Sequence, residues 1–517
     1  MPGRQSGLTR MRGIVRRLSR IQRRGWQWLR DQWFETYAGG DQRFLPLWPR
    51  GTDRLRLSAD ESAALRLACE RLLAHSFDIL GSGWRGWHRE GGRVGRLNAA
   101  NRATATRLAE PLGRDYRPID WHADRRAAYR FPADRWSRLI QPGPRPGVDI
   151  KVPWELARMH HLVQLALLAV DESTRPESAE ACAAEIGNQI RDFVAANPPR
   201  FGVNWRVAMD VAIRAANWVL AASILDAHGR DIATLRDLLG GSLRDHGRYI
   251  VGHLEWDPHV RGNHYLADVC GLAFIAAALP VDAESDAWLA LAAGEVLAEG
   301  VRQVHEDGSG FEGSTAYHRL SLDMLVHTVA LLIGIDARRW DPLRGGARLP
   351  RGLPTGFVAA ETDWAGLLGA DGRLQPPPAL IERLWRAAGF TRAVTRADGR
   401  ALLIGDNDSG RFIKPCPRYE VIDAQAARTR FPDRFVGRDD GEDLRELGED
   451  HTHLIRAIET LFGADDVTVD ARLIRWLANG RTLQRPSRRA GSGENLGTSA
   501  APAPPEGCNT LELPFPR

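Results

Sequence analysis

Apolar residues recur at helical spacing through most of the first two thirds of the chain. From about Ser58 to Ile333 they fall three or four positions apart in segments of roughly 15 to 22 residues, which Pro, Gly or Asp separate. Helices with short connections pack as antiparallel hairpins, so the pattern predicts a mainly α fold, in layers or in a ring. The segments are PWELARMHHLVQLALLAVD, PESAEACAAEIGNQIRDFVAA, NWRVAMDVAIRAANWVLAASIL, IATLRDLLGGSLRDHGRYIVGHL, VRGNHYLADVCGLAFIAAAL, SDAWLALAAGEVLAEGVRQV and STAYHRLSLDMLVHTVALLIG.

The pattern changes in the last third of the chain. A Pro- and Gly-rich stretch holds one more short helix, PPPALIERLWRAAGF, and ALLIGDNDSGRF and YEVIDA then predict strands with turns between them. Helical spacing returns from EDHTHL onward, and the chain from Arg481 is rich in Gly, Ser, Ala and Pro, which is typical of disorder. These changes predict a basic N-terminal segment (1–57), a helical domain (58–393), the start of a β-rich domain (394–480) and a disordered tail (481–517).

Composition and charge narrow the class of protein. The chain has 517 residues, of which 43% are hydrophobic and 26% charged, with a formal net charge of +5. Basic residues are concentrated in the first 24 positions. They could form a nucleic-acid-binding arm or a membrane-surface helix, but a solvated basic terminus is the favoured interpretation. No apolar run approaches the ~18 residues of a membrane span, and no secretory signal is recognised. We therefore expect no nucleic-acid partner and no stable membrane insertion, while location and oligomeric state stay open.

The five cysteines are scattered and form no CxxC pair. Neither a disulfide framework nor a metal site is therefore expected, and no cofactor is predicted.

Two polar groups stand where predicted helices begin. Asn263 follows a Gly and can cap the helix it opens, with His264 close enough to Asp268 for a side-chain pair. In the loop EDGSGFEGSTAYHRL, Ser314 can cap the next helix, so Glu312, Tyr317 and His318 project from the loop and first turn. The structural alternative for the tyrosine is a core ring whose hydroxyl bonds a neighbour.

A third group lies in NWRVAMDVAIRAANW. Arg206, Asp210, Arg214 and Asn217 are spaced to share one helix face, either as the wall of a groove for anionic sugar or as a solvent-facing ion-paired stripe. For two further candidates a structural role is favoured. Glu155, Arg158 and His161 share a helix face and are interpreted as an ion pair, and GDNDSG is interpreted as a plain turn rather than a Ca²⁺ loop.

Five motifs in this order resemble the heparinase II/III-like polysaccharide lyases, a family related to alginate lyases. They are DIKVPWELARMHHL, NWRVAMDVAIRAANW, RGNHYLADVCGLAF, DGSGFEGSTAYHRL and IGDNDSGRF. The resemblance implies an incomplete (α/α) toroid followed by an antiparallel β-sandwich, which here is only begun. It also implies that Asn263 and His264 neutralise a uronate carboxylate, that Tyr317 is the catalytic acid and often also the base, and that Glu312 supports them.

The resemblance predicts a lyase that cleaves an acidic, uronate-containing polysaccharide, glycosaminoglycan or alginate-like, by β-elimination. Arg206, Arg214, Asn217 and His318 are further candidate substrate contacts. The histidine that the family usually supplies from its sandwich is not assigned, since His451 and His453 lie in a predicted helix entry. Two alternatives stay open: a catalytically inactive carbohydrate-binding or surface-polysaccharide assembly protein, and a glycoside hydrolase on a related toroid, which requires two opposed carboxylates.

Overall fold

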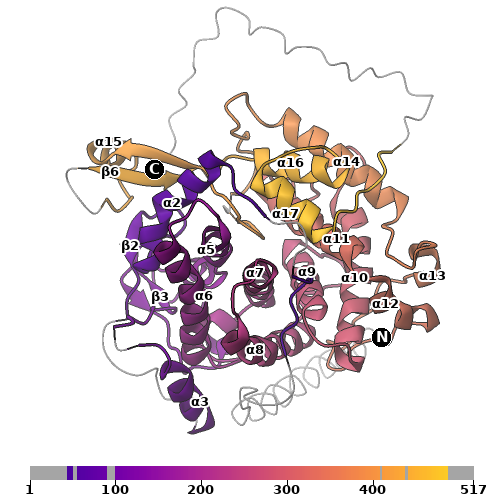
Figure 1. The fold of residues 1–517 in the computed structure, drawn as a ribbon, viewed down its shortest axis with the longest axis horizontal. Helices are drawn as coiled ribbons and strands as arrows, with labels where there is room; N and C mark the ends of the chain where they lie inside the picture. The colour runs from indigo at the N-terminus through magenta and orange to yellow at the C-terminus, as the bar shows by residue number, and fades with distance from the viewer. Residues whose placement is uncertain are drawn as a thin grey trace, which may run out of the picture. The chain divides into compact units, whose positions relative to one another are not determined.

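The computed structural model describes residues 43–50, 55–89, 99–113, 115–407, 410–436 and 441–486 (Figure 1). Most of the expected basic segment (1–57) and nearly all of the expected tail (481–517) lie outside these residues. The contacts group the chain as far as Arg485 into one compact unit, so the division near residue 393 stays a proposal.

The central helices form two layers (Figure 1). Each inner helix contacts the next inner one, and each outer helix packs on the inner helix that precedes it. The inner helices are α5 (His161–Val170), α7 (Ala208–Ala227), α9 (Asn263–Ala277) and α11 (Thr315–Gly334), and the outer ones are α6 (Pro176–Ala196), α8 (Ala233–Gly252) and α10 (Ala283–Gln303). The prediction of a mainly α fold of helical hairpins is confirmed.

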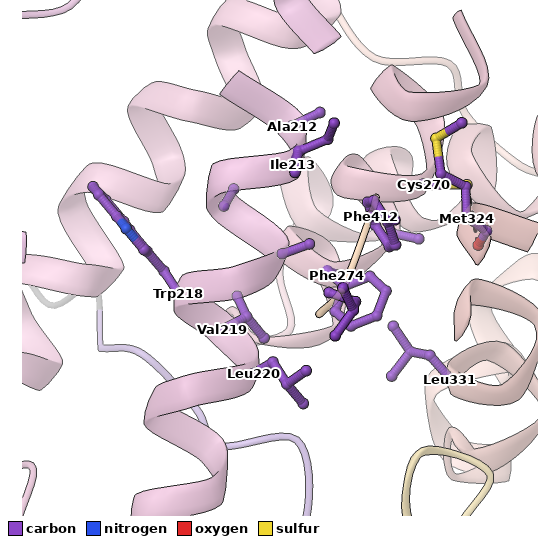
Figure 2. Close-up of a cluster of buried hydrophobic side chains, with 14 of the residues drawn as sticks. Ala212, Ile213, Trp218, Val219, Leu220, Cys270, Phe274, Met324, Leu331 and Phe412 are labelled. Carbon is purple, nitrogen blue, oxygen red and sulfur yellow. Dashed lines mark hydrogen bonds between the residues drawn. The ribbon is translucent and has the colours of Figure 1, made fainter. Parts of the chain in front are cut away.

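The inner helices are mostly apolar and carry buried residues on all sides, which is why they occupy the interior. Every residue of α7 is buried. Helices α7 and α9 approach closely at Gly271, where an added Cβ would lie 2.5 Å from the Cβ of Ala212. Figure 2 shows part of the core, in which Phe274 lies beside Phe412, while Trp218 projects from the other side of α7 and contacts Phe193 of α6 and His246 of α8.

Helix α7 also has the length and hydropathy of a membrane span, as does the bent pair Thr315–Gly334 with Ala337–Gly345. These criteria concern length and composition only. A buried core helix of a globular domain meets the same criteria, and α7 is buried throughout.

The helix expected to run unbroken from Pro153 is two helices. α4 (Lys151–Ala157) ends before α5 begins, and between them Met159 has φ of 56°, in the left-handed region that side chains other than Gly rarely adopt. The break turns His160 inward, where its Nε2 is hydrogen-bonded to the carbonyl oxygen of Arg411 at 2.9 Å.

The C-terminal part returns to helices, as predicted. α16 (Thr452–Leu461) and α17 (Val469–Leu477) pack on α11, and α16 also contacts α14 (Pro378–Ala393). Strands β5 (Tyr419–Asp423) and β6 (Glu442–Glu446) form an antiparallel pair with Tyr419 opposite Glu446.

Four further strands form two small antiparallel pairs nearer the N-terminus: β1 (Ser76–Asp78) with β2 (Trp84–Gly86), and β3 (Ala123–Asp124) with β4 (Tyr129–Arg130). Only small sheets therefore occur among the described residues. Remaining helices of the described part are α2 (Ala59–Leu73), α3 (Ala99–Ala109), α12 (Ala337–Trp340), α13 (Trp364–Leu367) and α15 (Ala424–Arg430).

The strand predicted over ALLIGDNDSGRF is wrong. In its described part only Ala401 forms an isolated bridge, with Thr395, and residues 410–414 run through the helical interior as a non-repetitive segment. We call Gly410–Lys414 the central segment. Its Phe412 and Ile413 are fully buried, so the apolar character that suggested a strand reflects burial among helices.

Candidate functional site

The inner helices all begin at one end of the inner layer, because each outer helix returns the chain before the next inner helix starts. The first turns of α7, α9 and α11 therefore gather there, together with the junction between α4 and α5. Helix N-termini contribute positive potential, which suits an anionic ligand.

Asn263 is the first residue of α9 and is held by Glu312. Its Nδ2 donates to both carboxylate oxygens of Glu312, at 3.0 and 2.8 Å, and its backbone N–H donates to Oε1 at 2.7 Å. The predicted N-cap role is wrong: Gly262 occupies the cap position, and the Asn263 side chain points to the neighbouring loop. An added Cβ on Gly262 would lie 2.9 Å from Glu312 Oε1, so the glycine allows the carboxylate to approach.

The spacing of the sequence suggested a pair between His264 and Asp268. In the structure His264 pairs with Glu255 instead. Its Nδ1 donates to Glu255 Oε2 in a short hydrogen bond, while Asp268 accepts the backbone N–H of Glu255 at 2.7 Å. Burial lowers the pKa of His264, but the hydrogen bond and charge of Glu255, with the charge of Asp210, outweigh it and raise the pKa above its ordinary value. Nδ1 is engaged by Glu255, whereas Nε2 makes no hydrogen bond within the described residues.

Tyr317 lies in the first turn of α11, and Ser314 caps this helix as predicted. The Ser314 Oγ accepts the backbone N–H of Tyr317 at 3.2 Å and donates to the carbonyl oxygen of Asp406. The Tyr317 hydroxyl donates to Asp406 Oδ2 at 3.2 Å. In this arrangement the phenol carries its proton and is hydrogen-bonded to a carboxylate, rather than packed as a core ring alone.

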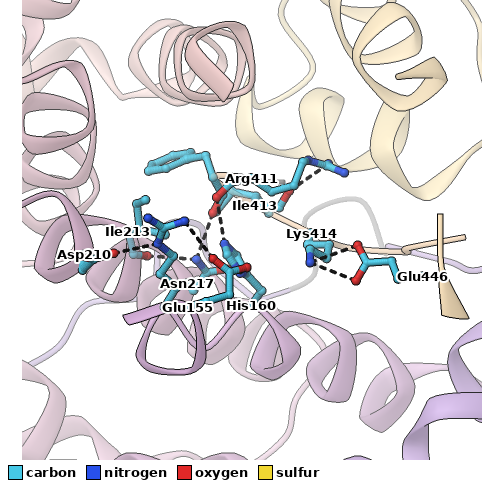
Figure 3. Close-up of polar contacts among 12 residues, drawn as sticks. Glu155, His160, Asp210, Ile213, Asn217, Arg411, Ile413, Lys414 and Glu446 are labelled. Atoms are coloured by element: carbon cyan, nitrogen blue, oxygen red, sulfur yellow. Dashed lines mark hydrogen bonds and ion pairs between the residues drawn. The ribbon is translucent and has the colours of Figure 1, made fainter. Parts of the chain in front are cut away.

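An ion cluster lies at the start of α7 (Figure 3), near enough to His264 for the charges of Asp210 and Arg158 to act on its pKa. Arg158 donates from Nε to Asp210 Oδ1 at 2.7 Å and from Nη1 to Glu155 Oε2 at 2.9 Å. The predicted ion pair of Glu155 and Arg158 is thus confirmed, whereas His161, expected on the same helix face, belongs to α5 and is hydrogen-bonded to Gln189. Burial raises the pKa of Asp210, against the opposing charge of Arg158.

The predicted polar face of α7 does not form. Arg206 precedes the helix and donates to the carbonyl oxygen of Ile140 at 3.3 Å. Arg214 is fully buried and donates to His246 Nε2 on the outer helix α8 at 3.1 Å, and burial lowers its pKa to about 9.

Two other candidate contacts are also internal. Asn217 is fully buried and donates to the carbonyl oxygen of Phe412 at 3.0 Å. His318 is buried and hydrogen-bonded through Nε2 to Thr391 Oγ1 at 2.9 Å, and burial lowers its pKa to about 4. Asn263, His264, Glu312 and Tyr317, which we call the gathered residues, lie at or just before the starts of the neighbouring helices α9 and α11. The side chains of Arg214, Asn217 and His318 bond to internal partners instead.

Side chains of the inner helices hold the central segment (Figure 3). The Asp323 carboxylate accepts the backbone N–H groups of Phe412 and Ile413, at 2.8 and 3.2 Å, and pairs with Arg411 at 3.2 Å. Gln164 donates to the carbonyl oxygen of Lys414 at 3.2 Å. The segment is therefore an integral part of the interior.

Sequence reasoning missed Glu255 and the role of Asp406. Glu255 lies in a loop without periodicity, nine residues before His264. Asp406 was seen only as part of a turn. Within the described ranges no group of three or more His, Cys, Asp or Glu is arranged to hold a metal ion. His451 and His453 sit at the start of α16, and His451 is buried; neither hydrogen-bonds to the gathered residues.

Comparisons with known proteins bear on the helical part of the chain. Residues 112–337 match the family described as heparinase II/III N-terminus. Among solved structures, a crystal structure of heparinase III matches 76% of this chain and 56% of its own length, at 13% identity and a TM-score of 0.30. The chain thus spans a little over half of that protein. No curated protein matches the chain.

Proposed function

We propose that this chain, which through residues 112–337 belongs to the heparinase II/III-like family, is a polysaccharide lyase that acts on an acidic, uronate-containing polysaccharide by β-elimination. The family suggests a lyase at a general level, and the substrate class and the residue roles are our proposal. The observation that supports it is that an amide, an imidazole and a phenol stand in the first turns of two neighbouring inner helices.

β-Elimination removes a proton from the sugar carbon beside the carboxylate and expels the 4-linked oxygen. That proton is only weakly acidic while the carboxylate keeps its full charge. Asn263 and protonated His264 would stabilise the enolate-like transition state by donating hydrogen bonds to the carboxylate oxygens. The raised pKa of His264 supports this role, because it favours the imidazolium form.

Tyr317 is the proposed acid for the departing oxygen. Its hydroxyl already donates a hydrogen bond, to Asp406, so a proton is present and its direction is set. If Tyr317 is also the base, it acts first as a phenolate that removes the sugar proton, and the phenol so formed then donates that proton to the departing oxygen, which regenerates the phenolate. Glu312 orients the Asn263 amide, and Glu255 orients the His264 ring.

The test is incubation with a panel of uronate polymers, followed by ultraviolet absorbance from the new C4–C5 double bond. Tyr317→Phe should lower turnover by at least ~10²-fold, on the usual magnitude of general acid–base catalysis. Tyr129→Phe, which removes a hydroxyl from a tyrosine beside Phe131, is the matched control and should leave turnover unchanged. A folded wild-type protein that produces no absorbance on any polymer would contradict the proposal. Uronate binding that persists without turnover, and unchanged in Tyr317→Phe, would indicate an inactive carbohydrate-binding protein.

A second candidate function is glycoside hydrolysis, and a specific observation favours it. Three carboxylates engage the gathered residues: Glu312 at Asn263, Glu255 at His264 and Asp406 at Tyr317. Hydrolysis of a glycosidic bond needs two such groups on opposite sides of it. Release of reducing ends without an unsaturated product would favour hydrolysis over elimination.

A further inference from the structure

A cavity of about 290 Å³ lies outside the gathered residues. The start of α2, one residue of α11, the central segment, β6 and the two C-terminal helices contribute to its wall. None of Asn263, His264, Glu312 and Tyr317 lines it. Its volume is near the lower limit of small-molecule cavities, roughly 300 Å³, which suits one sugar ring better than several.

Two buried arginines give the cavity wall positive charge. Arg319 is 2% exposed and donates only to backbone carbonyl oxygens, those of Gly448 and Gly410. Arg411 is 8% exposed; it pairs through Nε with Asp323, and its Nη1 makes no hydrogen bond within the described residues. Burial lowers the pKa of the neighbouring His453, and the charges of Arg411 and Arg319 lower it further, so both arginine charges act on the cavity wall.

One buried carboxyl group in the cavity wall is free to bind a ligand. Asp470 is 8% exposed and makes no hydrogen bond or ion pair within the part of the chain that is described. Burial raises its pKa to about 7, so near neutral pH the group can either accept or donate a hydrogen bond.

Most of the other carboxylates around the cavity are already engaged. Glu61 accepts the backbone N–H of Val469 at 2.7 Å. Glu446 pairs with Lys414 at 3.0 Å, and Asp450 pairs with Arg418. Besides the exposed Asp60, the groups left for a ligand are the arginine pair for an anion, Asp470 for hydroxyl groups, and Tyr419, which also lines the wall.

We propose that this cavity binds a single sugar unit that carries a carboxylate, with the carboxylate at Arg411 and Arg319 and ring hydroxyls at Asp470. The inference rests on the proposed function, which supplies such units either as free uronic acid or as the end of a polymer. It adds to that function a second uronate-binding site apart from Asn263, His264 and Tyr317.

The experiment measures the dissociation constant of sodium glucuronate by titration calorimetry, with glucose as the neutral control. Ala64 lines the cavity, and Ala63 beside it on α2 is exposed and does not. Ala64→Phe places a ring in the cavity without changing any charge and should weaken glucuronate binding at least about tenfold. Ala63→Phe, its matched control, should leave binding unchanged. Arg411→Gln should weaken binding to a similar extent through the loss of a charge-assisted hydrogen bond.

Asn263→Ala separates the two sites, since it removes a donor of the proposed lyase site only. Glucuronate binding that survives Asn263→Ala and is lost in Ala64→Phe supports the cavity, whether or not the protein shows lyase activity. Loss of binding in Asn263→Ala with retention in Ala64→Phe overturns the inference, as does the absence of binding to wild type by both glucuronate and a uronate-terminated oligosaccharide. Binding of the oligosaccharide alone, abolished by Ala64→Phe, supports the cavity and assigns it to the polymer end.

Discussion

Replacement of Glu255 by Gln tests how the protein keeps His264 protonated. Glu255 accepts the hydrogen bond of His264 Nδ1 and, through Oε1, the backbone N–H of Ala208 at 3.3 Å. Gln preserves the shape of the side chain and an acceptor for Ala208, but it removes the negative charge beside the imidazole. The pKa of His264, which is raised in the folded protein, should therefore fall in Glu255→Gln.

The contribution to stability follows from the exposure of the pair. The His264 side chain is 52% exposed, so solvent screens the interaction. The contribution should be about 0.5–1 kcal/mol, below the ~1.5–3 kcal/mol of a well-buried hydrogen bond to a charged group. A raised pKa means that the folded state holds the proton more tightly than the unfolded state. The stabilisation is therefore complete below the unfolded value of about 6.5 and disappears as the pH rises through the folded pKa.

The assay is urea unfolding of wild type and Glu255→Gln at several pH values between about 5 and 9, together with histidine NMR titration, in which the His264→Gln spectrum identifies the signal. We expect the stability difference to be largest near pH 5.5 and to shrink at alkaline pH. Glu306→Gln, which neutralises an exposed carboxylate, should show no such trend. A difference that is constant with pH would assign Glu255 to the Ala208 contact, and the reasoning on His264 would then be refuted.

Three further predictions concern other parts of the structure. Glu312→Ala should lower lyase kcat/KM about ten- to hundredfold by releasing the Asn263 amide, measured as initial rates, and an unchanged value would exclude the orienting role. Asp323→Ala should reduce the free energy of unfolding by about 3–5 kcal/mol, because Arg411 and two backbone N–H groups lose their buried partner; a loss below about 1 kcal/mol in urea unfolding would mean that the central segment is not held this way. Gly271→Ala should cost about 1–3 kcal/mol, since the new Cβ would meet Ala212, and thermal unfolding equal to wild type would show that α7 and α9 can separate freely.

Part of the local chemistry was readable from the sequence, although the Asn263 cap and the His264–Asp268 pair, which are equally local, were predicted wrongly. Apolar spacing predicted the helices, Ser314 was recognised as the cap of α11, and Glu155 and Arg158 were recognised as an ion pair. Asn263 and Tyr317 were singled out because they open consecutive inner helices. These features depend on helix geometry and capping, which adjacent residues determine without knowledge of the fold.

The tertiary structure decided which partner each polar side chain meets. Tyr317 binds Asp406, which lies 89 residues away, and no periodicity links the two. The helical spacing of Arg214 suggested that it lines a groove, but Arg214 is buried against α8. Which polar residues of an inner helix reach solvent depends on the helices that pack around it. The central segment has the apolar content of a strand, yet its backbone hydrogen bonds go to helix side chains such as Asp323. The spacing of hydrophobic residues indicates which positions are buried and whether they repeat as a helix or a strand. The pairing of buried polar groups depends instead on which helices and strands pack side by side.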